Sequence, residues 1–421
     1  MFKRMLLCLM AVTLLIASAR AEGDPLRVMG WMDASGYPGA TVEFVEGMGE
    51  GFDEIAGVIA TRNDQVDIFV LPAYAGLFSL KKHGYYAPLD ESAVLMNKLG
   101  DLYPAFQKAL LDDEGHLVGW VLYADLIGMQ VQADFLAENG LSVPRSFGEM
   151  LDECAALLEM DVLEREQSLL GYMGYTRQSV LELYMTLYIR SMQLDGGVVD
   201  FTRPEFVAMV ERISTELPEK DPFQGDYPEW AVFELDRGFM ELEDVLCFLP
   251  PVAADEPSAI ETHLTLAVVN PYSEHKEEAI ALLEWLATQE TAESYIYDAS
   301  LTEPMMSESV AREIDDLQAD IARLEAIEDP TVEQADELND KRAEAERLEK
   351  YRWRVAAETI ALYQEQAKGL SILEASPVTY DEALRTATQR FLKGAFDAEG
   401  FARTCQDHIS MIYQENGIEM K

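Results

Sequence analysis

The stretch Val66–Asp90, VDIFVLPAYAGLFSLKKHGYYAPLD, constrains the fold more than any other part of this sequence. Its first six residues, Val66–Leu71, are rich in β-branched and aromatic side chains, as in a strand buried on both faces. Pro72 ends this strand, and the aromatic loop Ala73-Tyr74 follows. Open parallel sheets place their ligand sites beyond the carboxyl ends of such strands. The stretch therefore predicts an α/β fold with a candidate site near Tyr74.

The first 21 residues have the three parts of a secretory signal. Lys3 and Arg4 precede the apolar run Met5–Ala17, and Ala19-Arg20-Ala21 gives a small-x-small cleavage site. No later segment reaches the ~18 unbroken apolar residues of a membrane-spanning helix. Cys8 lies inside the apolar run, so no lipobox is evident. We expect an exported protein, located extracellularly, in the cell envelope or in the periplasm.

Size and charge narrow the class of protein further. About 400 mature residues exceed what one hydrophobic core usually holds, so we expect two lobes. The formal net charge is −45, and removal of the three basic residues of the signal makes it −48. This charge opposes nucleic acid and anionic membranes, and it keeps an exported protein soluble. Cys154, Cys247 and Cys405 allow at most one disulfide, and burial as apolar side chains explains them better.

Strand-like and helix-like segments alternate along the chain, which is typical of α/β lobes with mainly parallel sheets. The expected strands are Leu26–Met32, Thr41–Val45, Val66–Leu71, Leu117–Tyr123, Gly128–Gln132, Leu169–Gly174, Val245–Leu249 and His263–Val269. The expected helices are Phe52–Thr61, Phe147–Glu159, Val180–Met192, Pro204–Ile213, Trp230–Met240, Lys276–Thr288, Tyr380–Lys393 and Ala398–Asn416. Ser146 and Glu149 form a capping box at the start of the second of these helices.

The order of these segments predicts where the chain passes between lobes. We expect it to cross near Ala124-Asp125 and to return near 253–262, so that a few residues there act as a hinge. The chain then divides into a signal peptide (1–21), the first part of lobe 1 (22–124), lobe 2 (125–260), the return to lobe 1 (261–306), a helical insertion (307–351) and C-terminal helices packed on a lobe (352–421).

The segment 307–351 differs in kind from the rest of the chain. Val310, Ile314, Leu317, Ile321 and Leu324 follow a heptad spacing on an otherwise charged helix. A Pro-containing break at 329–331 separates it from a second charged helix, 332–350, so the segment predicts an antiparallel helical hairpin. Because the apolar seam is one stripe wide, an insertion that satisfies itself is favoured over an arm that docks a partner.

With these segments in order, the chain resembles the family 1 extracellular solute-binding proteins of ABC importers, the maltose-binding-like group. Four stretches carry the likeness: VDIFVL with the Gly84-Tyr85 turn and Pro88-Leu89-Asp90, then 115–153, 199–206 and 266–287. The resemblance implies a two-lobe periplasmic-binding-protein-like fold with a hinge. It also implies a small ligand, most commonly a carbohydrate, held between the lobes of a monomer and read by a membrane permease.

One departure from the family concerns the first two strands. Only Asp33–Ala40, DASGYPGA, separates them, where the family has a full helix. Eight residues cannot form a parallel crossover helix, so this part of lobe 1 is expected to be rebuilt as a tighter turn. The ligand loop after the first strand is affected directly.

Carbohydrate sites combine aromatic platforms for sugar ring faces with planar polar groups for hydroxyls. The candidates follow strands that would end at the site or lie on the crossing strand: Trp31, Asp33, Tyr74, Trp120, Tyr123, Tyr175, Asp226 and Trp230. The alternative for every aromatic among them is core packing, because Trp and Tyr are mostly buried for their area. The sequence alone leaves both readings open.

Other motifs carry less weight. The glycine turn at 47–51 lacks the third glycine of a dinucleotide site, since Phe52 stands there, and Ser79–Lys82 matches Ser-x-x-Lys without its companion motifs. The five histidines form no pair with metal-ligand spacing, so we expect no metal or other cofactor. Carboxylate pairs arise by chance among 77 acidic residues. A non-enzymatic receptor is therefore favoured over a binding-fold protein with a degenerate site and over a secreted carbohydrate hydrolase.

Overall fold

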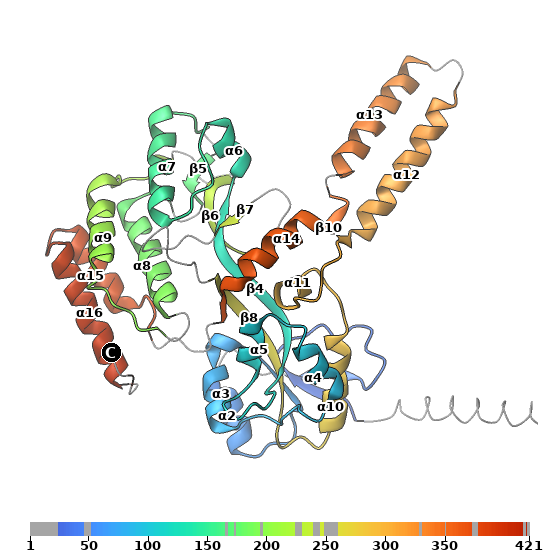
Figure 1. Ribbon diagram of the computed structural model, residues 1–421, viewed down its shortest axis with the longest axis horizontal. Helices are drawn as coiled ribbons and strands as arrows, with labels where there is room; N and C mark the ends of the chain where they lie inside the picture. Colours follow the sequence, from blue (N-terminus) through green and yellow to red (C-terminus); the bar gives the residue numbers. More distant parts are fainter. Residues whose placement is uncertain are drawn as a thin grey trace, which may run out of the picture.

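The computed structural model describes residues 24–45, 52–164, 167–171, 174–193, 197–223, 230–238, 245–247, 260–327, 331–349, 351–372, 378–415 and 418. In this part of the chain, two α/β lobes share one mixed sheet, and a helical hairpin projects from the body (Figure 1). This is the two-lobe architecture with an inserted hairpin that the sequence predicts. The expected signal at 1–21, the glycine turn at 47–51 and the loop with Asp226 lie outside the described residues.

The first lobe is built on five neighbouring strands. They are β1 (Leu26–Met29), β2 (Val42–Val45), β3 (Ile68–Pro72) and parts of β4 (Trp120–Val131) and β8 (Ile260–Val269), in the order β2-β1-β3-β8-β4. The helices α2 (Phe52–Ala60), α3 (Leu77–His83), α4 (Ala93–Leu99), α5 (Pro104–Leu110) and α10 (Lys276–Ala287) flank them. Ile68 and Phe69 are fully buried, which confirms the strand predicted at Val66–Leu71.

The two long strands β4 and β8 run from the first lobe into the second (Figure 1). The sequence predicts two shorter strands with a break at Ala124-Asp125, whereas the structure shows one continuous strand, β4. Both edges of β4 are hydrogen-bonded, to β8 along one half and to β6 along the other, so this pairing outweighs the poor strand propensity of Asp. Because β8 runs antiparallel to β3 and β4, the sheet is mixed rather than mainly parallel.

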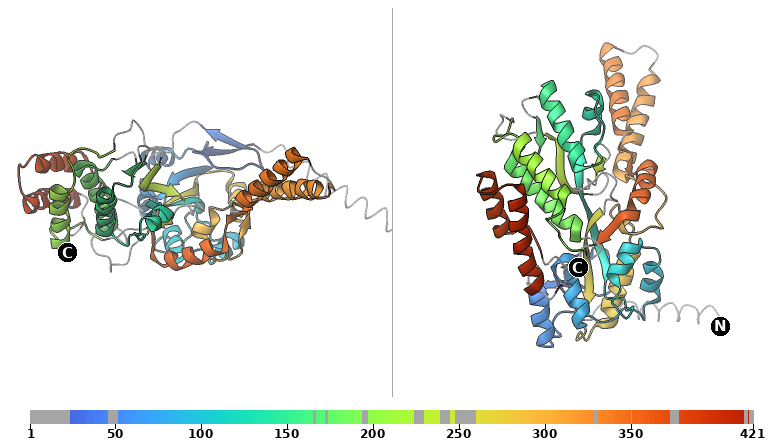
Figure 2. Two further views of the ribbon diagram at one scale, coloured as in Figure 1. Left: turned by 90° about the horizontal axis from the view of Figure 1, so that it is seen from above. Right: turned by 60° about the vertical axis from the view of Figure 1, so that its left-hand side comes forward.

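The second lobe has its own core on the far half of β4. Its other strands are β5 (Gln167–Leu170), β6 (Trp230–Gly238) and β7 (Val245–Cys247), and its helices are α6 (Ala133–Glu138), α7 (Phe147–Met160), α8 (Arg177–Gln193), α9 (Pro204–Glu216), α15 (Glu382–Leu392) and α16 (Ala398–Glu415). The hydrophobic cluster of the first lobe includes Leu126, and that of the second begins at Met129. Figure 2 shows α15 and α16 lying against the other helices of this lobe.

One predicted helix is wrong. The sequence predicts a helix over Trp230–Met240, and the structure shows the strand β6 over Trp230–Gly238. β6 lies between β4 and β5, and Ala231, Val232 and Phe233 are all buried. A central strand buried on both faces has a continuous apolar run rather than an alternation, and such a run cannot be distinguished from a buried helix by periodicity.

The predicted capping box before α7 is present in a modified form. Ser146 Oγ accepts a hydrogen bond from the Glu149 backbone N–H at 3.1 Å, as expected of an N-cap. The Glu149 carboxylate instead accepts from the backbone N–H of Arg145, one residue earlier, at 2.8 Å. It also pairs with the Arg145 guanidinium at 2.9 Å, so the helix start is satisfied from both sides.

The hairpin confirms the heptad reading of 307–351. Its helices are α12 (Glu308–Glu325) and α13 (Val332–Glu349), and the strands β9 (Met305–Met306) and β10 (Trp353–Val355) pair at its base. Ile314, Leu324 and Leu348 are buried along the seam between the helices. Salt bridges join the helices outside the seam, among them Lys341 to Asp320 at 2.7 Å. The apolar stripe is therefore used within the hairpin.

After the hairpin, the chain returns to the first lobe before it reaches the second. α11 (Ser294–Tyr297) lies before the hairpin and α14 (Ala357–Gln366) lies after it; the Tyr363 hydroxyl of α14 donates to the Ile296 carbonyl at 2.7 Å. The strand β11 (Leu370–Ile372) then pairs in parallel with β8. The hairpin is thus an insertion whose two ends are anchored on the same side of the molecule.

Candidate functional site

The candidate site lies at the edge of the first lobe where β1 and β3 end. β1 and β3 are parallel, with Val28 paired to Ile68 and Met29 to Phe69, so their carboxyl ends meet at this edge. Gly30 follows β1 at φ +101°, and a Cβ there would come within 2.8 Å of Val70 Cβ. Only glycine tolerates both the backbone angle and this approach. Gly30 thereby places Trp31 beside the end of β3.

Tyr74 leaves the end of β3 on the short 3₁₀ turn Ala73–Ala75. Ala73 is buried and fixes the turn on the lobe, while Tyr74 is 47% exposed. The Tyr74 ring lies 5.1 Å from the imidazole of His263 on β8, with the ring planes at 43°. This contact supports the Tyr74 ring from one side.

The register of β4 on β8 adds two side chains beside His263. Tyr123 pairs with Thr265 and Asp125 pairs with His263, and directly paired residues of antiparallel strands share a face. The register shifts between Val121 and Tyr123, which marks a bulge in β4. We call the set Trp31, Asp33, Tyr74, Tyr123, Asp125 and His263 the aromatic edge.

Exposure separates the predicted aromatic residues into two groups. Trp31, Tyr74 and Tyr123 of the aromatic edge are 68%, 47% and 40% exposed, although Trp and Tyr are usually well buried. Trp120 and Tyr175 are buried at 2% and 3%. The two groups therefore stand in different environments, one at a surface and one in the cores.

The remaining predicted site residues do not join the aromatic edge. Trp120 packs in the first core and Tyr175 in the second, where the Tyr175 backbone N–H donates to Asp221. Trp230 is half-buried at the start of β6, and its ring meets the Phe135 ring edge-on at 5.1 Å. Asp226 lies outside the described residues.

The aromatic edge carries hydrogen-bonding groups as well as rings. Asp33 is exposed and accepts a hydrogen bond from the Ser35 backbone N–H at 2.9 Å. Hydrogen bonds from the Ser35 side chain and backbone lower the pKa of Asp33, so its carboxylate stays ionised as an acceptor. Asp125 and His263 add a second carboxylate and an imidazole across β4 and β8. Such planar groups suit hydroxyl-bearing ligands.

Sequence reasoning missed His263 as a site residue. In the sequence, His263 is notable only because it lacks a partner with metal-ligand spacing. It nevertheless stands at the start of the strand predicted at His263–Val269, which the structure confirms as part of β8. The position of His263 beside Tyr74 depends on the pairing of β3 with β8, which lie almost 200 residues apart in the sequence. No local signal shows that pairing.

Several other site types find no support in the part of the chain that the structure describes. No group of three or more His, Cys, Asp or Glu side chains there could hold a metal ion. Cys154 and Cys405 are buried and form no disulfide, and burial raises the pKa of both thiols. Among the described helices, none combines the length and apolar character needed to span a membrane.

No protein-family model matches this sequence, and no curated protein matches it. Solved structures do. A cyclic α-maltosyl-1,6-maltose binding protein from Arthrobacter globiformis is 12% identical, with 93% of this chain and 100% of that chain covered at a TM-score of 0.55. The bacterial solute receptor AcbH, which prefers β-D-galactopyranose, is 11% identical, with 89% and 92% covered at a TM-score of 0.50. These matches show the fold: this chain has the two-lobe fold of solute-binding proteins, as its resemblance to the maltose-binding-like group predicts.

Proposed function

We propose that this chain is an extracytoplasmic solute receptor that captures a carbohydrate between its two lobes and delivers it to an ABC importer. The observation that carries the proposal is the aromatic edge: Trp31, Tyr74 and Tyr123 are exposed after or on neighbouring strands of one lobe, and Tyr74 packs on His263, the partner of Asp125. The neighbours in fold are named for sugars that they bind, which supports the same ligand class here.

The residues of the aromatic edge have distinct roles in this proposal. Tyr74 and Trp31 stack on the apolar faces of sugar rings, and Tyr123 presents a ring from the crossing strand. Asp33 and Asp125 accept hydrogen bonds from hydroxyls, and His263 supports Tyr74 while offering a ring nitrogen. A hydroxyl that pairs with one of these groups on leaving water has its desolvation cost offset by the new hydrogen bond.

The connection between the lobes suits closure around a ligand. β4 passes from one core to the other between Leu126 and Met129, so a rotation can be absorbed at a few strand residues while both cores stay packed. A permease that contacts both lobes would distinguish the closed state from the open one. Export through the 1–21 segment would place the receptor where it meets solute first. No catalytic step is part of this proposal.

A thermal-shift screen tests the proposal. The mature protein is heated with glucose, galactose, maltose, maltotetraose and ribitol. A ligand present at one hundred times its Kd stabilises the folded state by about 2.7 kcal/mol, which raises the melting temperature. In Tyr74→Ala the apparent affinity for the ligand, derived from the melting-temperature shift, should fall at least tenfold. Met411→Ala, which removes a side chain 56% exposed on α16, is the control and should keep the full shift. A wild-type protein that no sugar or polyol stabilises contradicts the proposal and favours a degenerate site.

A further inference from the structure

Among the described residues, the connection between β1 and β2 leaves part of β2 exposed. The two strands pair in parallel from Leu26–Val42 to Met29–Val45, yet the twelve residues between them form no helix. Parallel strands are normally covered by the helix of their crossover. Here Phe44 on β2 is 46% exposed, which is unusual for an aromatic residue in a parallel sheet.

The connection is nevertheless a built structure. The Tyr37 ring packs 5.5 Å from the Trp285 ring of α10, and the Tyr37 backbone N–H donates to the Ala34 carbonyl at 3.2 Å. Burial of the ring, helped by the charges of Glu278 and Glu284, raises the pKa of the Tyr37 hydroxyl. The loop is thus pinned to α10.

A cavity of about 420 Å³ lies beside this loop. We call it the crossover hollow; Trp31, Asp33, Ser35, Tyr37, Thr41 and Phe44 are among its lining residues. Residues with aromatic rings, a carboxylate and three hydroxyls therefore line one space, and the aromatic edge combines rings with polar groups in the same way.

The crossover hollow shares two residues with the aromatic edge. Trp31 and Asp33 belong to both, so a ligand that stacks on Trp31 borders the hollow directly. The strand order β2-β1-β3-β8-β4 puts Phe44 on β2 two strand positions from β3, which Tyr74 follows. At ~4.8 Å per strand this is roughly 10 Å, which is longer than a single sugar ring.

We propose that the crossover hollow is a second carbohydrate subsite and that the ligand is an oligosaccharide running from Tyr74 over Trp31 into the hollow. The inference rests on the proposed function, and it specifies the length of the ligand. In place of the missing helix, the sugar units covering Phe44 bury the apolar surface that the short crossover leaves exposed.

Calorimetric titration with two length series tests the proposal: glucose, maltose and maltotetraose, and xylose and xylotetraose. The wild-type protein should bind the tetrasaccharide of one series at least tenfold more tightly than its monosaccharide. Phe44→Ala should weaken the tetrasaccharide at least fivefold and leave the monosaccharide unchanged. Phe78→Ala, which removes a ring 53% exposed on α3 outside both surfaces, is the matched control and should change neither.

A second variant tests the space rather than the ring. Ala40 lines the crossover hollow, so Ala40→Trp should fill it and reduce the tetrasaccharide affinity to that of the monosaccharide. Melting curves of both variants show whether they are folded.

The possible outcomes separate the two proposals. Equal affinities for all lengths in wild type, or no effect of Phe44→Ala and Ala40→Trp, overturn the subsite and leave the receptor intact. A wild-type dimer that Phe44→Ala converts to monomers identifies a second copy of this chain as the occupant, which also overturns it. If no sugar of either series binds to wild type, the proposed function and the subsite fall together.

Discussion

This molecule has two groups of aromatic side chains, one buried in a core and one exposed to solvent. In the second lobe, Tyr184, Tyr188, Phe201, Phe206 and Phe401 are buried, and neighbouring rings lie 4.6–6.4 Å apart. In the aromatic edge, Trp31, Tyr74 and Tyr123 keep 40–68% of their surface in contact with solvent. The first group contributes to folding through buried area, whereas the second leaves that area available to a ligand.

The difference arises from where the backbone places each group. The buried rings come from α8, α9, α16 and the turn before α9, elements that enclose them on several sides. The exposed rings follow strand ends, or lie next to a bulge in a strand. Aromatic content alone therefore says little about function, and the end of a strand is the informative position.

The largest effect should come from the buried group. Phe206 is fully buried, and its ring centroid lies 4.6 Å from that of Tyr188 and 4.9 Å from that of Phe201. Phe206→Ala leaves a cavity between them and should reduce the free energy of unfolding by about 3–5 kcal/mol. Urea denaturation measures it. The folded variant should keep wild-type affinity for sugar, and a loss below about 1 kcal/mol would mean that the second lobe collapses around the site.

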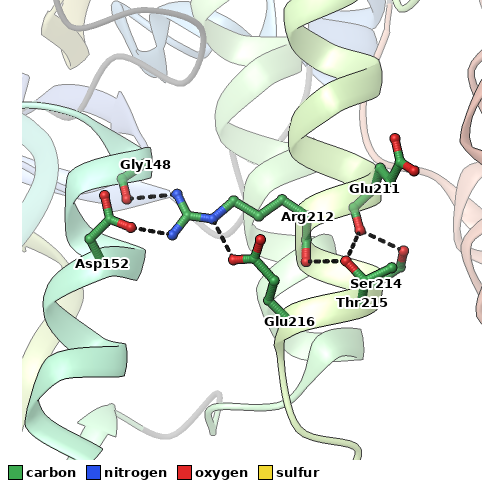
Figure 3. Close-up of polar contacts among 7 residues, drawn as sticks. All are labelled: Gly148, Asp152, Glu211, Arg212, Ser214, Thr215 and Glu216. Carbon is green, nitrogen blue, oxygen red and sulfur yellow. Dashed lines mark hydrogen bonds and ion pairs between the residues drawn. The ribbon is translucent and has the colours of Figure 1, made fainter. Parts of the chain in front are cut away.

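The next largest effect on stability should come from the polar contacts that join the helices α9 and α7 beside the buried group. In Figure 3 the Arg212 guanidinium of α9 donates to the Gly148 carbonyl of α7 at 3.1 Å and pairs with Asp152 of α7 and with Glu216. Arg212→Ala should therefore lower stability by about 1–2 kcal/mol, since charge-assisted bonds between two helices are lost.

Arg145→Ala provides the control for this clamp. Arg145 is 80% exposed and pairs with Glu149 on the same helix start, so its removal should lower stability far less than the removal of Arg212. Equal losses in both variants would show that the contact between α9 and α7 contributes nothing beyond a surface ion pair.

A smaller, pH-dependent effect comes from Glu153 on α7. Burial, reinforced by the charge of Glu149, raises the pKa of this carboxyl to about 7, and its Oε2 has no hydrogen-bond partner among the described residues. The folded protein therefore holds this proton more tightly than the unfolded chain, in which the pKa of the carboxyl is near 4.5. Stability consequently falls as the pH rises from about 4.5 to 7.

Glu153→Gln removes the charge and should abolish this fall. The variant should melt at a higher temperature than wild type at pH 8 and at the same temperature at pH 4. Glu159→Gln, an exposed position on the same helix, should show no such difference. A parallel pH profile for wild type and Glu153→Gln would contradict the assignment.

The features of the fold that the sequence predicts correctly are those with local signals. The heptad stripe of α12 and the buried run of β3 are readable within a dozen residues. β6 was predicted wrongly because a fully buried strand and a buried helix have the same apolar composition. The sequence predicts two strands in place of β4 because the pairing with β8, rather than the local sequence, carries the strand through Ala124-Asp125.

The candidate site was only partly predictable for a related reason. Trp120 and Tyr123 stand three residues apart on one strand, yet Trp120 is 2% exposed and Tyr123 is 40% exposed. The register on β8 pairs Trp120 with Ala267 and Tyr123 with Thr265, so the bulge between Val121 and Tyr123 brings both side chains to one face of the sheet. Their different exposure therefore depends on what packs on that face at each point, which is not encoded locally. Trp31 stands near the end of the strand predicted at Leu26–Met32 and Tyr74 shortly after the one predicted at Val66–Leu71, so their place at a strand end is readable locally.

The smallest expected effect on stability sharpens the comparison most. Tyr74 is half-exposed and its main ring contact is with His263, so Tyr74→Ala should change the free energy of unfolding by no more than about 0.5 kcal/mol. Trp31→Ala should behave alike, because two-thirds of its surface is in solvent. Urea denaturation in the same series as Phe206→Ala provides the scale. If either variant lost 2 kcal/mol or more, its ring would be a packing element like Phe206, and the division between a buried group for folding and an exposed group for ligand would fail. Little change in stability together with a loss of sugar affinity is the combination that core packing cannot produce.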